Sequence, residues 1–181
     1  MEGGADALTT SFEAKGEPMA TADEMKAAFV GAGEAMAASI IDAAGIWGDQ
    51  VLPPEAVAEI NPRATGEAWT PQQTVEHAVS SIGFFRMLIA SAMELEAEPP
   101  QRTPFPTAGE AGTALTAAIE ATKATLSSVG DGDLAKPVGL PEVSVNYLKS
   151  LGIEATANVE GTMQIIGAHL GDHAAQIRKA L

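Results

Sequence analysis

Two helix start signals, each followed by apolar residues at helical spacing, limit this chain to a largely helical fold. Thr21 stands three residues before Glu24, and Thr70 stands three residues before Gln73. In such a capping box the threonine hydroxyl accepts a hydrogen bond from the third helical residue, whose side chain returns one to the threonine backbone. Pro71 takes the first helical position, where its missing N–H costs nothing. Both signals therefore predict where a helix begins.

Four segments carry apolar residues at spacings of three and four, and each is predicted to be a helix. They run over about 21–44, 70–95, 107–129 and 159–180, and Gly or Pro residues end the first three. Only 4% of the residues are aromatic and alanine is abundant, a composition typical of closely packed helices. We predict an all-α fold, a four-helix bundle with a long loop between the third and fourth helices.

The predicted bundle occupies most of the chain. Residues 1–20 contain Gly, Thr and acidic residues without apolar periodicity, so we expect a flexible N-terminal arm before a single domain at 21–181. Two connections, 48–68 and 130–158, are long for a compact domain. Apolar residues in the second connection indicate that it packs over the bundle, with a short helix near residues 143–150.

Charge and composition exclude several classes of protein. The chain has 10 Lys and Arg against 24 Asp and Glu, a formal net charge of −14, so we expect no nucleic-acid partner. Charges or glycines interrupt the apolar runs well short of the about 20 residues of a membrane span, and we expect no membrane association. The N-terminus does not resemble a signal peptide, and the expected location is cytoplasmic. Cysteine is absent, which excludes disulfides and thiolate metal ligands.

All three histidines of the chain fall on stripes that are predicted to face inward. His77 shares its stripe with Ser81, Phe84 and Leu88. His169 and His173 are four residues apart, so their rings lie on one helix face. Three neutral imidazoles suit Zn, Ni, Cu or Fe(II) and leave a coordination position open for water or substrate. A chance pair on one helix and a hydrogen-bonded core histidine on the other explain the pattern equally well, and the spacing leaves both interpretations open.

Three further residues are candidates for a role beside the histidines. Asp172 precedes His173 and can orient a ligand imidazole, or it is a solvated acid. Gln176 can hydrogen-bond a metal-bound water or a substrate, or it caps a neighbouring loop. Tyr147 is the chain's one tyrosine and lies in the connection predicted to cover the bundle, where it is either a pocket residue or a packing anchor.

Two segments resemble motifs of a known family. Residues 69–77 begin with Trp-Thr-Pro and end in His77, and they resemble the Trp-Ser/Thr-Pro-x5-His opening of the second helix in DinB-like (damage-inducible) proteins. Residues 169–177 resemble the His-x3-His-x2-Gln-Ile segment of the last helix in those proteins. The order and separation of the motifs also match, so the resemblance covers about residues 21–181. One departure is Gln73, where many relatives carry an acid, and we interpret Gln73 as a helix cap.

The resemblance implies a site and a chemistry. DinB-like proteins are four-helix bundles whose three histidines bind a divalent metal, often Zn or Ni, which implies His77, His169 and His173 as ligands. Relatives include thiol-dependent S-transferases and the metal-binding domain of mycothiol-dependent maleylpyruvate isomerase. The expected function is therefore a metal-dependent transfer of a low-molecular-weight thiol to a small-molecule substrate.

Other functions are compatible with the same residues. A metal-binding protein without turnover and a metal-dependent hydrolase would both use the same three histidines. A structural helical bundle, or a homodimer through the alanine-rich first or third helix, is less favoured. An anionic thiol would need a locally positive rim in this acidic chain, and the candidates for that rim are Arg86, Arg102, Lys149 and Arg178.

Overall fold

The computed structural model describes residues 20–60, 66–100, 103–150 and 157–181. The predicted all-α class is confirmed, because the described residues form helices and no strands. Nearly all of the predicted N-terminal arm lies outside the described residues. The α-helices are α1 (Ala22–Asp42), α2 (Pro54–Ile60), α3 (Pro71–Ala92), α4 (Ala108–Leu126), α5 (Glu142–Ser150) and α6 (Val159–Lys179), and the short 3-10 helices are η1 (Ala43–Ile46) and η2 (Asp131–Asp133).

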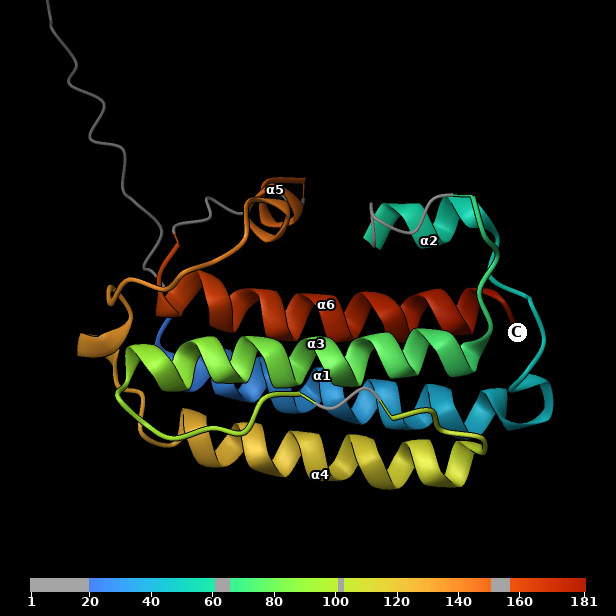
Figure 1. Ribbon diagram of the computed structural model, residues 1–181, viewed down its shortest axis with the longest axis horizontal. Coiled ribbons are helices and arrows are strands. Elements are labelled where there is room, and N and C mark those ends of the chain that lie inside the picture. Colours follow the sequence, from blue (N-terminus) through green and yellow to red (C-terminus); the bar gives the residue numbers. More distant parts are fainter. Residues whose placement is uncertain (1–19, 61–65, 101–102, 151–156) are drawn as a thin grey trace, which may run out of the picture.

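Four long helices lie side by side along the length of the molecule (Figure 1). Helix α1 packs against α4 and α6, and α3 packs against the same two helices. The chain runs in one direction through α1 and α6 and in the opposite direction through α3 and α4 (Figure 1). The short helices α2 and α5 both lie outside this group, on the side of α6 (Figure 1).

The predicted start signals are present as hydrogen-bonded caps. Thr70 Oγ1 accepts from the Gln73 backbone N–H at 3.1 Å, and Gln73 Oε1 accepts from the Thr70 N–H at 2.9 Å, so Gln73 is a cap as interpreted. Thr21 and Glu24 form the same box at the start of α1. A third box at Thr107, which was not among the predicted start signals, begins α4.

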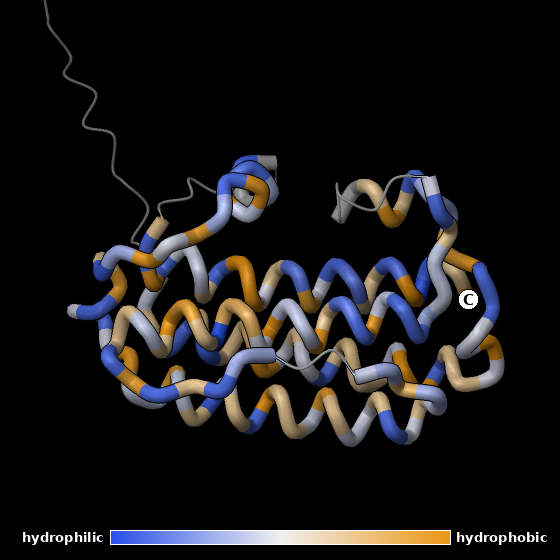
Figure 2. Tube along the Cα trace, in the orientation of Figure 1, coloured by the Kyte–Doolittle hydropathy of each residue, from blue (hydrophilic) through white to orange (hydrophobic). Residues whose placement is uncertain are grey.

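The core lies between the four long helices, with one apolar face of each turned inward. Figure 2 shows apolar and polar residues alternating around these helices. The approach of α1 to α6 is close at Gly167, where an added Cβ would lie 3.8 Å from the Phe29 backbone. The largest fully buried side chains are Phe29, Met36, Ile40, Leu52, Ile82, Ile89, Leu115, Leu126, Ile165, Ile166 and Leu170.

The segment that connects α3 to α4 is called the crossover. It returns the chain along the bundle, and α4 therefore runs parallel to α3 (Figure 1). The Trp47 indole N–H donates to the Phe105 carbonyl at 2.9 Å. The Phe105 N–H donates to the Glu76 carboxylate at 2.8 Å, and Arg86 donates to the Glu98 carbonyl at 3.0 Å. These bonds join residues up to 58 positions apart, so local sequence patterns did not predict them.

The two long predicted connections both contain helices. The helix expected near residues 143–150 is confirmed as α5. Helix α2 was not expected and forms within the connection 48–68. The start of that connection is held by paired backbone hydrogen bonds between Leu52 and Trp69, of 3.0 and 2.9 Å.

Helix α1 is more apolar than the interrupted runs of its sequence suggested. Residues Ala22–Ile46 have a window of mean hydropathy 1.3, which is long and apolar enough to cross a membrane by length and composition. A core helix passes the same test, and α1 places its buried face against α4 and α6.

Candidate metal centre

Three histidine side chains from two helices meet between α3 and α6. His77 comes from the second turn of α3, and His169 and His173 come from successive turns of α6. The ring centroids of His169 and His173 are 4.5 Å apart, and each lies 5.1 Å from the His77 ring. One ring nitrogen from each residue lies within 4.8 Å of the other two. The structure therefore brings together all three residues that the sequence singled out.

Gln176 determines which nitrogen of His173 faces the cluster. The Gln176 side-chain Nε2 donates to the Ala56 carbonyl, which can only accept, so the orientation of the amide is fixed. Its Oε1 then lies 3.0 Å from His173 Nδ1 and accepts the hydrogen there. The tautomer that results carries its lone pair on Nε2, the nitrogen that a metal would use. Gln176 therefore bonds both to the His173 ring and to the backbone of α2, and its predicted bond to a metal-bound water or substrate stays a prediction.

The two histidines of α6 are held neutral by their surroundings. His173 is 1% exposed and His169 is 8% exposed. Burial lowers the pKa of His173 to about 3, with a further contribution from His77. Burial also lowers the pKa of His169 well below its ordinary value, and His173 and His77 add to this effect. Neutral imidazoles are the form in which histidine binds metals.

The donor set fits a divalent metal. His173 Nε2 is buried and has no hydrogen-bond partner among the described residues, which is costly for a polar atom unless something else binds it. His77 Nε2 and His169 Nε2 lie 3.1 Å apart, a separation that either a shared hydrogen or a shared cation satisfies. Two nitrogens at about 2.0–2.1 Å from one tetrahedral metal ion lie about 3.3–3.4 Å apart, close to this value.

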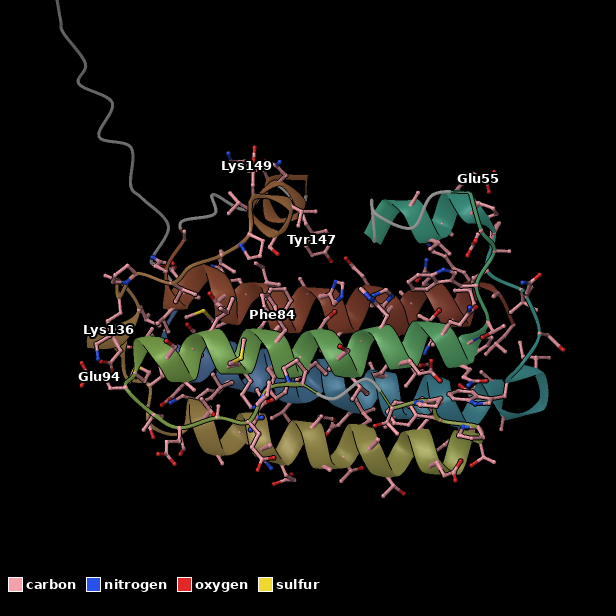
Figure 3. All side chains as sticks on the ribbon, in the orientation of Figure 1. Glu55, Phe84, Glu94, Lys136, Tyr147 and Lys149 are labelled. Atoms are coloured by element: carbon pink, nitrogen blue, oxygen red, sulfur yellow. The ribbon has the colours of Figure 1, made fainter. Side chains whose placement is uncertain are left out.

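Tyr147 and Asp172 form a second pair beside the histidines. Tyr147 points from α5 toward α6 (Figure 3), where its hydroxyl donates to Asp172 Oδ2. Its ring meets the His169 ring edge-on, with centroids 5.7 Å apart. Burial and the bond to Asp172 raise the pKa of Tyr147 well above its ordinary value, so the hydroxyl stays protonated and donates. The structure thus places both candidate residues at the site.

Two aromatic rings that were not among the candidate site residues lie beside the histidines. The Trp69 ring lies 5.5 Å from His77, and the Phe85 ring lies 6.4 Å from His169, each in an edge-on arrangement. Helical spacing could have predicted that Phe85 faces inward, because it shares the buried face of α3 with Ile82 and Ile89. No local pattern could have predicted the contact of the Ala56 carbonyl with Gln176, because the two residues are 120 positions apart.

The suggested basic rim is not formed by the described residues. Arg86 donates to the Glu98 carbonyl on the crossover, and Arg178 donates to the Ala35 carbonyl of α1. Lys149 is exposed and points away from the bundle (Figure 3). Arg102 lies outside the described residues. The Asp172 carboxylate, which accepts from Tyr147 beside His169, is a charged group next to the site.

Three histidines that converge from two helices of an all-α protein form a group that could hold one metal ion in a helical core. The sequence profile of the DinB superfamily matches residues 49–177, and the chain belongs to this superfamily. The matched region contains His77, His169 and His173 and leaves out α1. No curated protein and no solved structure matches the chain.

Proposed function

We propose that this protein binds one divalent metal ion, Zn or Ni, through His77, His169 and His173. The observation that carries the proposal is the buried Nε2 of His173, which lacks a hydrogen-bond partner among the described residues and lies beside two other imidazoles. Membership of the DinB superfamily supports the same interpretation. The proposal includes a DinB-type four-helix bundle made by α1, α3, α4 and α6, with the connection that contains α5 beside the metal.

We further propose that the protein is a cytoplasmic enzyme that transfers a low-molecular-weight thiol to an electrophilic small molecule. A divalent metal supplies Lewis acidity, which lowers the pKa of a thiol bound to it. The thiol sulfur forms the new bond to carbon, and the leaving group departs with the thiol proton. The thiol must come from outside, because the chain has no cysteine.

The residues of the chain have defined parts in this function. The three histidines would hold the metal as neutral donors. Gln176 keeps the His173 lone pair on Nε2 by accepting from Nδ1. Aromatic rings at Trp69, Phe85 and Tyr147 limit the access of water to the histidines.

The metal content of the purified, untagged protein tests the binding proposal. We expect one equivalent of Zn or Ni by elemental mass spectrometry, and near-complete loss in His169→Ala and His173→Ala. Titration with Co(II) should give visible absorption bands in the wild type that both variants lack. A protein that contains no metal, and takes up none at neutral pH, would contradict the proposal.

A matched control separates loss of ligands from damage to α6. Met163→Leu changes a buried side chain, 2% exposed, on the same helix and six residues before His169. Hydrophobic exchanges of similar volume typically cost less than about 1.5 kcal/mol. Met163→Leu should therefore keep its metal, and loss of metal in this variant too would assign the effect to folding.

The transferase proposal has its own test. The metal-loaded protein should accelerate the reaction of at least one thiol with an electrophile, and His169→Ala should not. The amount of thiol consumed should equal the amount of leaving group released. A stoichiometric metal with no acceleration for any pair would favour metal binding without turnover, and release of a product without the thiol would favour a hydrolase.

A further inference from the structure

Two short helices flank α6 on the side of the histidines, and they are held in different ways. Helix α2 has buried apolar anchors, because Leu52, just before it, and Val57 within it are each 1% exposed. Among the α5 side chains with a described exposure none is buried, and each is exposed or only partly buried. None of these α5 side chains belongs to the hydrophobic core.

A polar contact beside the histidines attaches α5 to α6. The Tyr147 hydroxyl donates to Asp172, which lies on α6 between the two candidate ligands of that helix. The Tyr147 ring lies against His169 at 5.7 Å between centroids. A hydrogen bond to an ionised carboxylate is stronger than one between neutral groups. The attachment of α5 and the surroundings of His169 thus depend on the same side chain.

We propose that α5 is a gate over the three-histidine centre and that the Tyr147–Asp172 hydrogen bond holds it closed. Segments with few buried apolar contacts open locally at a low free-energy cost, whereas the long helices open only with the whole molecule. When the bond breaks, α5 moves away with the Tyr147 ring, and His169 is exposed to incoming metal or substrate. The effect of the gate on metal exchange rests on the proposed metal site, whereas the Tyr147–Asp172 hydrogen bond does not depend on that site.

A gate has a kinetic signature that distinguishes it from a ligand-positioning role. A gate that opens more readily speeds metal entry and metal exit by the same factor. The rate constants for metal uptake and metal release then both rise, while their ratio, the Kd, does not change. A residue that orients a ligand changes the Kd, because it acts on the bound state alone. Tyr147→Phe keeps an aromatic ring at this position of α5 and removes only the hydroxyl.

Metal exchange in Tyr147→Phe tests the gate. We expect Zn uptake and Zn extraction by a chelator each to become about tenfold faster, the factor for a lost hydrogen bond to a charged group, with the Kd unchanged within about twofold. Asn146→Ala, an exposed neighbour on α5, should match the wild type. Unchanged rates, or a weaker Kd with faster extraction alone, would overturn the proposal.

Hydrogen exchange of the metal-free protein gives a readout that needs no metal. Tyr147→Phe should lower amide protection in α5 and leave protection in the middle of α6 unchanged. Equal protection of α5 in both proteins would overturn the gate even if the metal site is real. A protein that binds no metal but shows this loss of protection would refute the proposed function and leave the Tyr147 contact established.

Discussion

At the scale of single residues, one amide organises the site. Gln176 donates to the Ala56 carbonyl and accepts from His173 Nδ1, so one side chain ties α2 to α6 and selects a tautomer. The consequence is a buried imidazole with an available Nε2 and a strongly lowered pKa. A neutral buried histidine is a metal donor at neutral pH and a source of acid sensitivity when no metal is present.

The metal-free protein should lose stability on mild acidification. Folded His173 stays neutral until the pH approaches about 3, whereas the unfolded chain protonates it near 6.5, so the unfolded state binds more protons in between. The free energy of unfolding should therefore fall as the pH drops below 6.5, by about 1.4 kcal/mol per pH unit for each such histidine. Urea unfolding between about pH 7.5 and 5.5 measures this slope before most carboxylates titrate.

The control for this slope is a variant without the titrating group. His173→Gln should show a shallower pH dependence, whatever its stability at pH 7. A stability that is flat over the range, or an equal slope in both proteins, would show that His173 is protonated in the folded state.

At the scale of elements, the crossover after α3 decides how the four long helices are connected. It lies against α3 at Gly83, where an added Cβ would come within 2.9 Å of the Pro100 Cβ and 3.4 Å of its Cα. A proline ring and its backbone cannot turn aside as a flexible side chain can. Gly83 therefore allows a close approach between helix and crossover.

Gly83→Ala should destabilise the protein. Overpacking typically costs about 1–3 kcal/mol, and the helix propensity of alanine returns up to about 1 kcal/mol, so a net loss of about 1 kcal/mol is expected. Thermal or urea unfolding measures this loss. Gly31→Ala is the matched control, since that exposed glycine of α1 has nothing within 4 Å of an added Cβ, and it should gain stability. A gain in both variants would show that the crossover moves aside freely.

At the scale of the whole molecule, the candidate ligands join α3 to α6, and α6 also packs on α1. An ion bound by all three histidines would therefore cross-link two segments that are 92 residues apart in the sequence. The unfolded chain does not hold the three imidazoles together, so metal binding and folding are linked.

Added metal should raise the unfolding temperature, and a chelator should reverse the change. At a free metal concentration of about 100 Kd the stabilisation is about 2.7 kcal/mol. His77→Ala should remove the shift while leaving most of the helical circular dichroism, because His77 is only partly buried. A shift of equal size in His77→Ala would place the metal elsewhere, on the acidic surface of the chain.

The local sequence determined the helical class, the starts of α1 and α3, and the shared face of His169 and His173. Each of these depends on residues within about two turns of one another, where spacing and capping chemistry act directly. The tertiary structure alone decided the path of the crossover, the Gln176 contact with Ala56, and the contact of Tyr147 with Asp172. Those contacts join segments far apart in the sequence, and their geometry follows from how the long helices pack, which no local pattern contains.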